Sequence, residues 1–148
     1  MKTEIVAKLR LTKAAELTSL ARFREFIDQA SVARGIDAET CYDLKLAVDE
    51  ACTNVITHGY AEMNPGSIIL DLEFSPDQVV MRLTDFGHPF EPYEPSAPDM
   101  NAALANQPTS GFGLFFIYST MDVVDYKTRE EGNTLILTKR LKTVIREP

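Results

Sequence analysis

The chain has 148 residues, of which 45% are hydrophobic and 25% are charged. These values are typical of one globular domain with a core of its own. The 22 aspartates and glutamates outnumber the 15 lysines and arginines, so the net charge is −7. An acidic chain repels nucleic acids and anionic membranes, and direct binding to either is therefore not expected.

The sequence also lacks the features of export and membrane insertion. No apolar run approaches the roughly 18 residues that a membrane-spanning helix needs. The opening residues alternate charged and apolar side chains and lack the apolar stretch of a signal peptide. Cys41 and Cys52 would lie roughly 16 Å apart on one helix, which is too far for a disulfide. We therefore expect a cytoplasmic protein with two reduced thiols.

The first part of the sequence predicts one strand and two helices. Residues 4–11 alternate apolar and charged side chains, as a strand does. From residue 13 to about residue 33, apolar side chains recur every three or four positions, and Gly35 supplies a stop. A second helix is expected from its N-cap at Asp37 to about His58.

A hairpin and a long connection follow. Residues 67–74 and 78–84 are expected to form two strands joined by a tight turn. Residues 88–110 hold five of the eight prolines and show no clear periodicity. A connection of that length is uncommon in a compact domain and is often an active-site lid. We expect the lid of this protein there.

The C-terminal part predicts a short helix over residues 113–121 and two strands, over residues 123–127 and 134–139. No repeat or linker divides the chain, so we expect a single domain over residues 1–148. Strands and helices in this order indicate an α+β fold. We expect a two-layer α/β sandwich in which helices cover one face of a mixed sheet.

Glu50 and Asn54 stand four residues apart in the second predicted helix. At about 100° per residue, both side chains lie on the flank of the apolar stripe that faces the core, whereas Asp49 points to solvent. An asparagine oxygen suits a hard cation such as Mg²⁺, and a glutamate is a base that can align a water or a hydroxyl group. The pair therefore indicates a site at the rim of a cleft, although it also fits an ordinary solvated helix face.

Two glycine motifs follow along the chain. Asp85 comes directly after a predicted strand, and Gly87 allows a sharp turn, so the carboxylate can accept a hydrogen bond from an amino group such as that of a nucleobase. Gly111 and Gly113 open the short helix, whose free amides can bind a phosphate. Taken alone, the first motif also fits a strand-ending turn and the second an ordinary helix N-terminus. Neither motif is a Rossmann fingerprint or a P-loop.

In combination and in this order, the three motifs resemble those of the Bergerat-fold, or histidine-kinase-like, ATPases. Within that superfamily they are similar to the bacterial anti-sigma-factor serine kinases. The resemblance extends from about residue 5 to residue 141 and implies the Bergerat ATP-binding fold. Four parts of the chain carry it: residues 49–60, residues 85–90, residues 110–117 with 121–124, and residues 132–139.

The resemblance implies a role for each residue of these motifs. Glu50 would be the general base that activates the hydroxyl group of a protein serine, and Asn54 would hold the Mg²⁺ that bridges the phosphates of ATP. Asp85 would accept a hydrogen bond from the adenine amino group, and Gly87 would let the base lie against the backbone. Three further residues complete the expected nucleotide site: Gly111 and Gly113 would present amides to the phosphates, and Thr134 would lie near the adenine.

The function that the resemblance implies is that of an anti-sigma regulator with ATP- and Mg²⁺-dependent serine/threonine protein kinase activity. Its substrate would be a STAS-domain anti-anti-sigma protein, and it would also bind a sigma factor and form a homodimer. The family usually carries an arginine just ahead of the second glycine motif, but here no lysine or arginine lies between Arg82 and Lys127. A cation aimed at the transferred phosphoryl group can be worth orders of magnitude in rate. The alternative is therefore a nucleotide-binding partner-switching anti-sigma module with little or no kinase activity.

Overall fold

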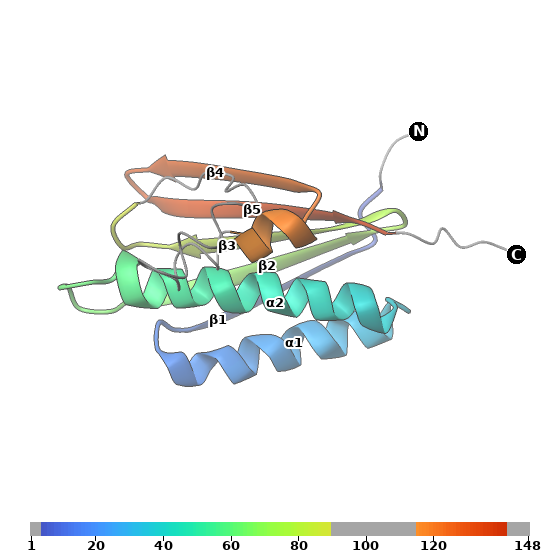
Figure 1. The fold of residues 1–148 in the computed structure, drawn as a ribbon, viewed down its shortest axis with the longest axis horizontal. Coiled ribbons are helices and arrows are strands. Elements are labelled where there is room, and N and C mark those ends of the chain that lie inside the picture. Colours follow the sequence, from blue (N-terminus) through green and yellow to red (C-terminus); the bar gives the residue numbers. More distant parts are fainter. Residues whose placement is uncertain (1–3, 90–114, 142–148) are drawn as a thin grey trace, which may run out of the picture.

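The computed structural model describes residues 4–89 and 115–141, and five strands of this part form a sheet in the order β1–β2–β3–β5–β4 (Figure 1). The strands are β1 (Ala7–Ala14), β2 (Ser67–Ser75), β3 (Gln78–Asp85), β4 (Val123–Arg129) and β5 (Gly132–Arg140). The two edges of the sheet are therefore β1 and β4, and β3 lies at its centre.

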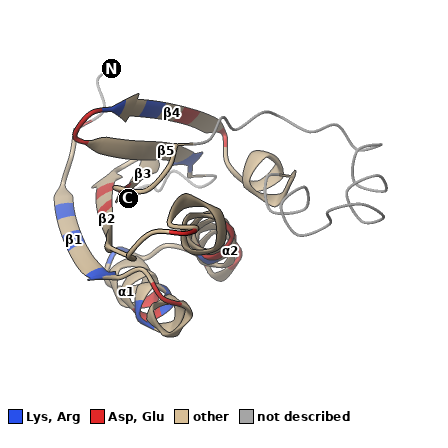
Figure 2. Ribbon diagram, turned by 90° about the vertical axis from the view of Figure 1, so that its left-hand side faces the viewer, with Lys and Arg blue, Asp and Glu red and all other residues tan. Residues whose placement is uncertain are grey.

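The helices lie on one face of this sheet (Figures 1 and 2). A 3₁₀ turn, η1 (Leu17–Ser19), leads into α1 (Leu20–Ala33), and α2 (Ala38–Asn54) continues into a π-helical turn, η2 (Val55–Gly59). A short helix at residues 115–120 lies beside α2, on the side away from α1 (Figure 2). The expected two-layer α+β sandwich is confirmed.

The sheet is antiparallel at every pairing within the described residues, so the expectation of a mixed sheet was wrong. The connections give the physical reason. Two helices carry the chain away from β1 and back again, so β2 starts where β1 stops, and Ala14 pairs with Ser67. Short turns join β2 to β3 and β4 to β5, and such hairpins connect antiparallel strands.

The predicted elements are present, with shifts at their ends. The side chain of Asp37 accepts a hydrogen bond of 3.0 Å from Thr40 N, which confirms the predicted N-cap of α2. Helical structure begins later than residue 13, because β1 continues to Ala14. Residues 90–114, and with them nearly all of the predicted lid, lie outside the described residues. The lid and the single-domain organisation therefore stay predictions.

The core fills the space between the helices and the sheet. Phe23 and Ile27 of α1 and Leu44 of α2 are at most 1% exposed. They belong to one cluster with alternate residues of the central strands, such as Leu70 and Met81. Burial of these apolar side chains holds both helices on the same face of the sheet.

The opposite face of the sheet carries ion pairs between neighbouring strands. Arg10 of β1 lies 2.6 Å from Asp71 of β2, and Arg82 of β3 lies 2.8 Å from Glu73 of β2. These pairs cross neighbouring strands, as the alternation of side chains along strands requires.

No helix in the described part of the chain is long and apolar enough to cross a membrane. Cys41 and Cys52 are free, buried thiols. Burial raises the pKa of the Cys52 thiol, which keeps it protonated and unreactive. The absence of a bond between the two cysteines agrees with their predicted separation.

Candidate functional site

Glu50 and Asn54 lie one turn apart near the C-terminal end of α2. Asn54 is 6% exposed, and its carboxamide has no hydrogen-bond partner among the described residues. Glu50 is half-buried, and burial, with a smaller contribution from the charge of Asp49, raises the pKa of its carboxyl group. A carboxamide that is available to a ligand and a base with a raised pKa therefore lie on one side of the helix.

The helical wheel predicts that Asp49 points into solvent, but in the structure its carboxylate is paired with Arg24. Its two carboxylate oxygens each accept a hydrogen bond of 3.0 Å from Nη1 of Arg24, on α1. A pattern along one helix cannot reveal this partner, because it comes from the packing of α1 against α2. The Arg24 charge offsets part of the negative charge that Asp49 places beside Glu50.

The first glycine motif lies against the C-terminal end of α2. There the helix widens into the π-helical turn η2, a feature that is frequent at functional sites. The carbonyl oxygen of Gly59 accepts a hydrogen bond of 2.6 Å from His88 N. A Cβ on Gly87 would lie 2.3 Å from the same oxygen, so only glycine fits. This backbone contact brings the turn after Asp85 to the end of the helix that carries Asn54.

Asp85 ends β3 at this turn and is 4% exposed. Its Oδ1 accepts hydrogen bonds from Gly87 N at 2.8 Å and from Asn133 Nδ2 at 3.0 Å. Its Oδ2 has no donor among the described residues. Because two donors hold one oxygen, the carboxylate is oriented and its second oxygen is available to accept from a ligand.

Asn133 lies within the C-terminal part of the resemblance (residues 132–139), but the sequence alone assigns it no role. It lies opposite Asp85 in the pairing of β5 with β3 and is 2% exposed. Its Nδ2 donates to Asp85 Oδ1 and to Gly87 O, both at 3.0 Å, while its Oδ1 accepts a bond of 2.5 Å from the Thr128 hydroxyl group. The Thr128 bond sets the direction of the amide, so that its nitrogen faces Asp85.

Thr134, which the resemblance places near the adenine, lies on the other face of the sheet. Its hydroxyl oxygen is 3.2 Å from that of Thr84, on β3. Side chains alternate along β5, so Leu135 and Asn133 face the helices and Thr134 faces away. The β5 residue that faces Asp85 is therefore Asn133. The alternation with Leu135 is the sequence signal that identifies it.

The hydroxyl group of Tyr60 also contacts the backbone of the first glycine motif. Its hydroxyl group donates to Ser67 O and accepts from Phe86 N, both at 2.9 Å. Burial raises the pKa of this phenol, which keeps its donor proton in place. A Cβ on Gly66 would lie 2.9 Å from the phenol oxygen, so the absence of a side chain there makes room for Tyr60. Tyr60 thus links the start of β2 to the turn that follows Asp85.

The second glycine motif falls outside the described part of the chain, so the contact of Gly111 and Gly113 with phosphates stays a prediction. The helix that follows it is described at residues 115–120, beside α2 (Figure 2). Ile117 and Met121 are buried in the core, which fixes this helix against the rest of the fold.

The side chains fit a magnesium ion whose coordination shell a ligand completes. No group of three or more His, Cys, Asp and Glu residues that could hold a metal occurs in residues 4–89 and 115–141. Asn54 offers one neutral oxygen, which Mg²⁺ accepts together with phosphate oxygens and waters. Asn54 could therefore supply one of the oxygen ligands of a Mg²⁺ ion.

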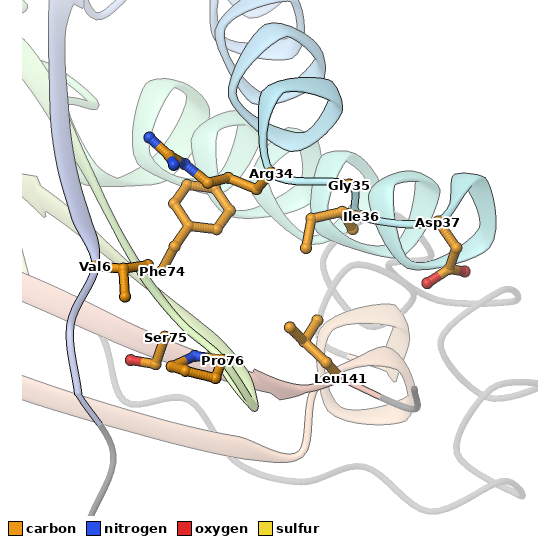
Figure 3. A pocket seen from close by; sticks show the side chains of 9 residues that line it. All are labelled: Val6, Arg34, Gly35, Ile36, Asp37, Phe74, Ser75, Pro76 and Leu141. Carbon is orange, nitrogen blue, oxygen red and sulfur yellow. The ribbon is translucent and has the colours of Figure 1, made fainter. Parts of the chain in front are cut away.

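A cavity of about 320 Å³ opens at the opposite end of the molecule (Figure 3). It lies at the turn between α1 and α2, and Ile36, Phe74 and Leu141 are among its lining residues. None of the predicted site residues lines it. The length of α2, about 25 Å, separates it from Asn54, so this cavity is not part of the candidate nucleotide site.

A helix-covered antiparallel sheet with a buried, oriented aspartate at the end of its central strand defines the class of this protein. The chain belongs to the histidine kinase-like ATPase domain family, whose model matches residues 13–139. The match confirms the resemblance that the three motifs indicate.

Named relatives make the comparison more specific. Serine-protein kinase RsbW of Bacillus cereus (strain ATCC 10987 / NRS 248) and of Bacillus mycoides (strain KBAB4) are each 28% identical to this chain over 150 residues. The alignments cover 95% of this chain and 81% of each relative. A crystal structure of the RsbU and RsbW domains of Rv1364c from Mycobacterium tuberculosis has the same fold, with a TM-score of 0.67 and 19% identity. The match covers 92% of this chain, which spans about a third (33%) of that solved chain.

Proposed function

We propose that this protein binds Mg-ATP and is a serine/threonine protein kinase that phosphorylates a STAS-domain anti-anti-sigma protein. It would act in the cytoplasm as a homodimeric anti-sigma regulator that also binds a sigma factor. The names of the RsbW relatives, which align with 95% of the chain, support the kinase assignment. The observation that carries the proposal is the oriented Asp85 carboxylate, whose Oδ2 is available at the end of the helix that bears Glu50 and Asn54.

Asp85 is suited to adenine because an ionised carboxylate only accepts hydrogen bonds. The exocyclic amino group of adenine donates one, whereas guanine carries an acceptor oxygen at that position and would be repelled. Gly87 has no side chain to keep the base away from the backbone. Asn133, rather than Thr134, is the β5 residue that we include in this adenine subsite.

Glu50 is suited to be the general base of phosphoryl transfer. The serine oxygen of the partner would attack the γ-phosphorus atom while its proton passes to the Glu50 carboxylate. The bond between the γ-phosphorus and the β,γ-bridging oxygen would break, and ADP would leave. A raised pKa strengthens a carboxylate as a proton acceptor, which agrees with this role.

Asn54 would hold the Mg²⁺ ion through its carboxamide oxygen, and the ion would neutralise charge on the phosphates when bound. The backbone amides of Gly111 and Gly113 would bind the phosphates at the other side. An Asn54→Ala variant tests the metal role. In the presence of Mg²⁺ it should bind ATP more weakly than the wild type does. In EDTA, without the metal, the variant and the wild type should bind ATP equally. An equal loss with and without the metal would refute that role.

The lack of a lysine or arginine ahead of the second glycine motif favours a second function. No lysine or arginine occurs between Arg82 and Lys127, so this stretch supplies no positive side chain to the transferred phosphoryl group. The protein would then be a nucleotide-binding module that exchanges partners with little or no phosphotransfer.

Transfer of labelled γ-phosphate from Mg-ATP to a STAS-domain protein encoded beside this one distinguishes the two functions. The wild type is compared with Glu50→Gln and with Glu39→Gln, a control at the other end of α2. We expect Glu50→Gln to bind ATP normally and to label the partner at least about 100-fold more slowly, whereas the control is unchanged.

Each other outcome has a clear meaning. Equal labelling by Glu50→Gln and the wild type would refute the role of Glu50. Tight ATP binding by the wild type without labelling of the partner would favour the partner-switching function. A wild type that does not bind ATP would refute both functions.

A further inference from the structure

A polar row of side chains, Thr128, Asn133 and Asp85, crosses three neighbouring strands at one end of the sheet. The strand register places Thr128 of β4 opposite Asn133 of β5, and Asn133 opposite Asp85 of β3. Side chains that lie opposite one another in paired strands share a face of the sheet. Two positions along the strands, the same face carries Leu135 and Leu83, which belong to the core. The polar row therefore borders the core at the end of β3 that carries the candidate site.

The hydrogen bonds along the polar row all run in one direction. The Thr128 hydroxyl group donates to Asn133 Oδ1 at 2.5 Å, and Asn133 Nδ2 donates to Asp85 Oδ1 at 3.0 Å. The same nitrogen also donates to Gly87 O at 3.0 Å. Both the oxygen and the nitrogen of the Asn133 amide are therefore in use, and the bonds end on the carboxylate that would bind the adenine.

These bonds select one orientation of the Asn133 amide. If the amide were turned over, its oxygen would face two other acceptors, Asp85 Oδ1 and Gly87 O. Asn133 is only 2% exposed, so water does not replace a bond that a protein group withdraws. The orientation therefore depends on each bond of the network.

The turn between β4 and β5 brings the polar row against the end of β3. Gly132 in this turn has a φ of +148°, a backbone conformation that favours glycine. A Cβ on Gly132 would lie 2.9 Å from Asp85 O, so the two backbones are in direct contact. Thr128 itself is exposed on the edge strand. A change of its side chain therefore leaves the packing of the core largely intact.

We propose that Thr128 is a positioning residue for the adenine end of the nucleotide site. Its hydroxyl group keeps the Asn133 nitrogen on Asp85 Oδ1, which leaves Asp85 Oδ2 to accept from the 6-amino group of the base. Thr128 acts on the base only through Asn133 and Asp85. The inference rests on the proposed binding of ATP.

Loss of the Thr128 hydroxyl group should disturb the contact with the base. Asn133 Oδ1 would become a buried acceptor without a donor, which is unfavourable because the oxygen has lost its water and gained no partner. The amide would shift to bring this oxygen to water, and the donor to Asp85 Oδ1 would shift with it. Asp85 would then be held less firmly, and Oδ2 would no longer keep one direction.

Three variants test this role. Thr128→Val removes the hydroxyl group but keeps the shape of the side chain, and Thr128→Ser keeps the hydroxyl group. Thr12→Val is the control, because Thr12 is an exposed threonine on the other edge strand, β1, and its side chain has no hydrogen bond within the described residues. Calorimetry gives the Kd of each variant for ATP and for purine riboside triphosphate, both with Mg²⁺. The second ligand differs from ATP only in lacking the 6-amino group, so the ratio of the two Kd values measures the contact of that group with Asp85.

We expect the wild type to bind ATP at least about tenfold more tightly than purine riboside triphosphate. In Thr128→Val the ratio should fall to about twofold or less, because only the Kd for ATP rises. Thr128→Ser should stay close to the wild-type ratio, and Thr12→Val should equal it. A general loss of stability would weaken both ligands alike, so a change in the ratio isolates the positioning role.

A double variant shows whether Thr128 acts through Asn133. In Asn133→Ala the ratio of the two Kd values should already be low, and the addition of Thr128→Val should lower it no further. A wild-type ratio in Asn133→Ala, or a further fall in the double variant, would refute this route.

An unchanged ratio in Thr128→Val would overturn the inference, and so would equal losses for the two ligands. A wild type that binds both ligands equally would also overturn it, although ATP binding would stand. If the wild type binds neither ligand, the proposed function fails, and nitrogen-15 spectra of the Asn133 side chain then decide. Its amide protons should exchange with water faster in Thr128→Val than in Thr12→Val, and equal rates would refute the role. If Thr128→Val does not fold, Thr128→Ala gives the same comparisons.

Discussion

The fold disfavours the charged form of Glu50. Burial and the nearby Asp49 raise its pKa above the ordinary value of 4.5. A carboxyl group whose pKa is higher in the folded state contributes stability at low pH, and that contribution is lost as the pH rises through the folded pKa. The charged form of Glu50 therefore reduces stability relative to the protonated form.

The pH dependence of activity should follow the charges around Glu50. A base works when it is deprotonated, so the rate should rise with pH through the pKa of Glu50. Asp49→Asn removes a negative neighbour and should lower that pKa, which moves the acidic limb of kcat/KM to lower pH. Arg24→Gln leaves Asp49 without its cation and should move the limb to higher pH. Shifts in the same direction for both variants, measured in pH–rate profiles, would contradict this account.

Substitution of Asn133 should reduce stability and ATP binding more than substitution of its neighbour Thr134. Asn133→Ala removes a donor from buried Asp85 and should lower the free energy of unfolding by about 1–3 kcal/mol. It should also weaken ATP binding, because Asp85 loses part of its orientation. Thr134→Ala, on the opposite face of the sheet, should leave ATP binding unchanged. Urea unfolding measures the stability of both variants, and calorimetry measures their affinity for ATP. A larger loss for Thr134→Ala than for Asn133→Ala would assign the adenine subsite to Thr134 instead.

Among the elements, the widened end of α2 and the turn after β3 form one unit. The carbonyl oxygen of Gly59, in the π-helical turn η2, accepts a hydrogen bond from His88 N. The two backbones can come this close because Gly87 has no side chain. The end of α2 that carries Asn54 is thereby held against the turn that follows Asp85. Neither element would form this contact alone, because the pairing of β2 with β3 sets where the turn lies.

Gly87→Ala should separate these elements. The new Cβ would lie 2.3 Å from Gly59 O, so the turn must shift, at a cost of about 2–4 kcal/mol. Gly35→Ala is the control: no atom lies within 4 Å of its Cβ, and only its φ of +73° adds strain, about 1 kcal/mol. We expect Gly87→Ala to lose ATP binding and Gly35→Ala to keep it. Equal affinities for ATP, measured by calorimetry, would show that the contact does not form the site.

For the whole molecule, the stability comes from the layer between the helices and the sheet. Ile27→Ala empties a fully buried position of α1 and should cost about 2–5 kcal/mol. Val32→Ala, on the same helix but 78% exposed, should change the free energy of unfolding by less than about 0.5 kcal/mol. Urea unfolding measures both. A small loss of unfolding free energy in Ile27→Ala would mean that α1 is not packed against the sheet as described.

Much of this architecture follows from local patterns. The alternation over residues 67–74 and 78–84 predicts β2 and β3 closely, and Asp37 predicts the start of α2. The N-terminal strand is displaced by three residues, because its pairing with β2 rather than its own pattern decides where it ends. The direction of the strands could not be derived from periodicity, since it depends on how the connections return the chain to the sheet.

By itself, the sequence determined the α+β class, the pairing of Glu50 with Asn54 on one side of a helix, and the glycine at position 87. These features depend on residues close together in the chain, where helical and strand periods apply. Only the tertiary structure decided that Asn133 faces Asp85, that Arg24 pairs with Asp49, and that Lys139 reaches both Thr120 and Asp43. Each of these contacts joins residues that are far apart in sequence. Their partners are selected by strand register and helix packing, which a local pattern does not contain.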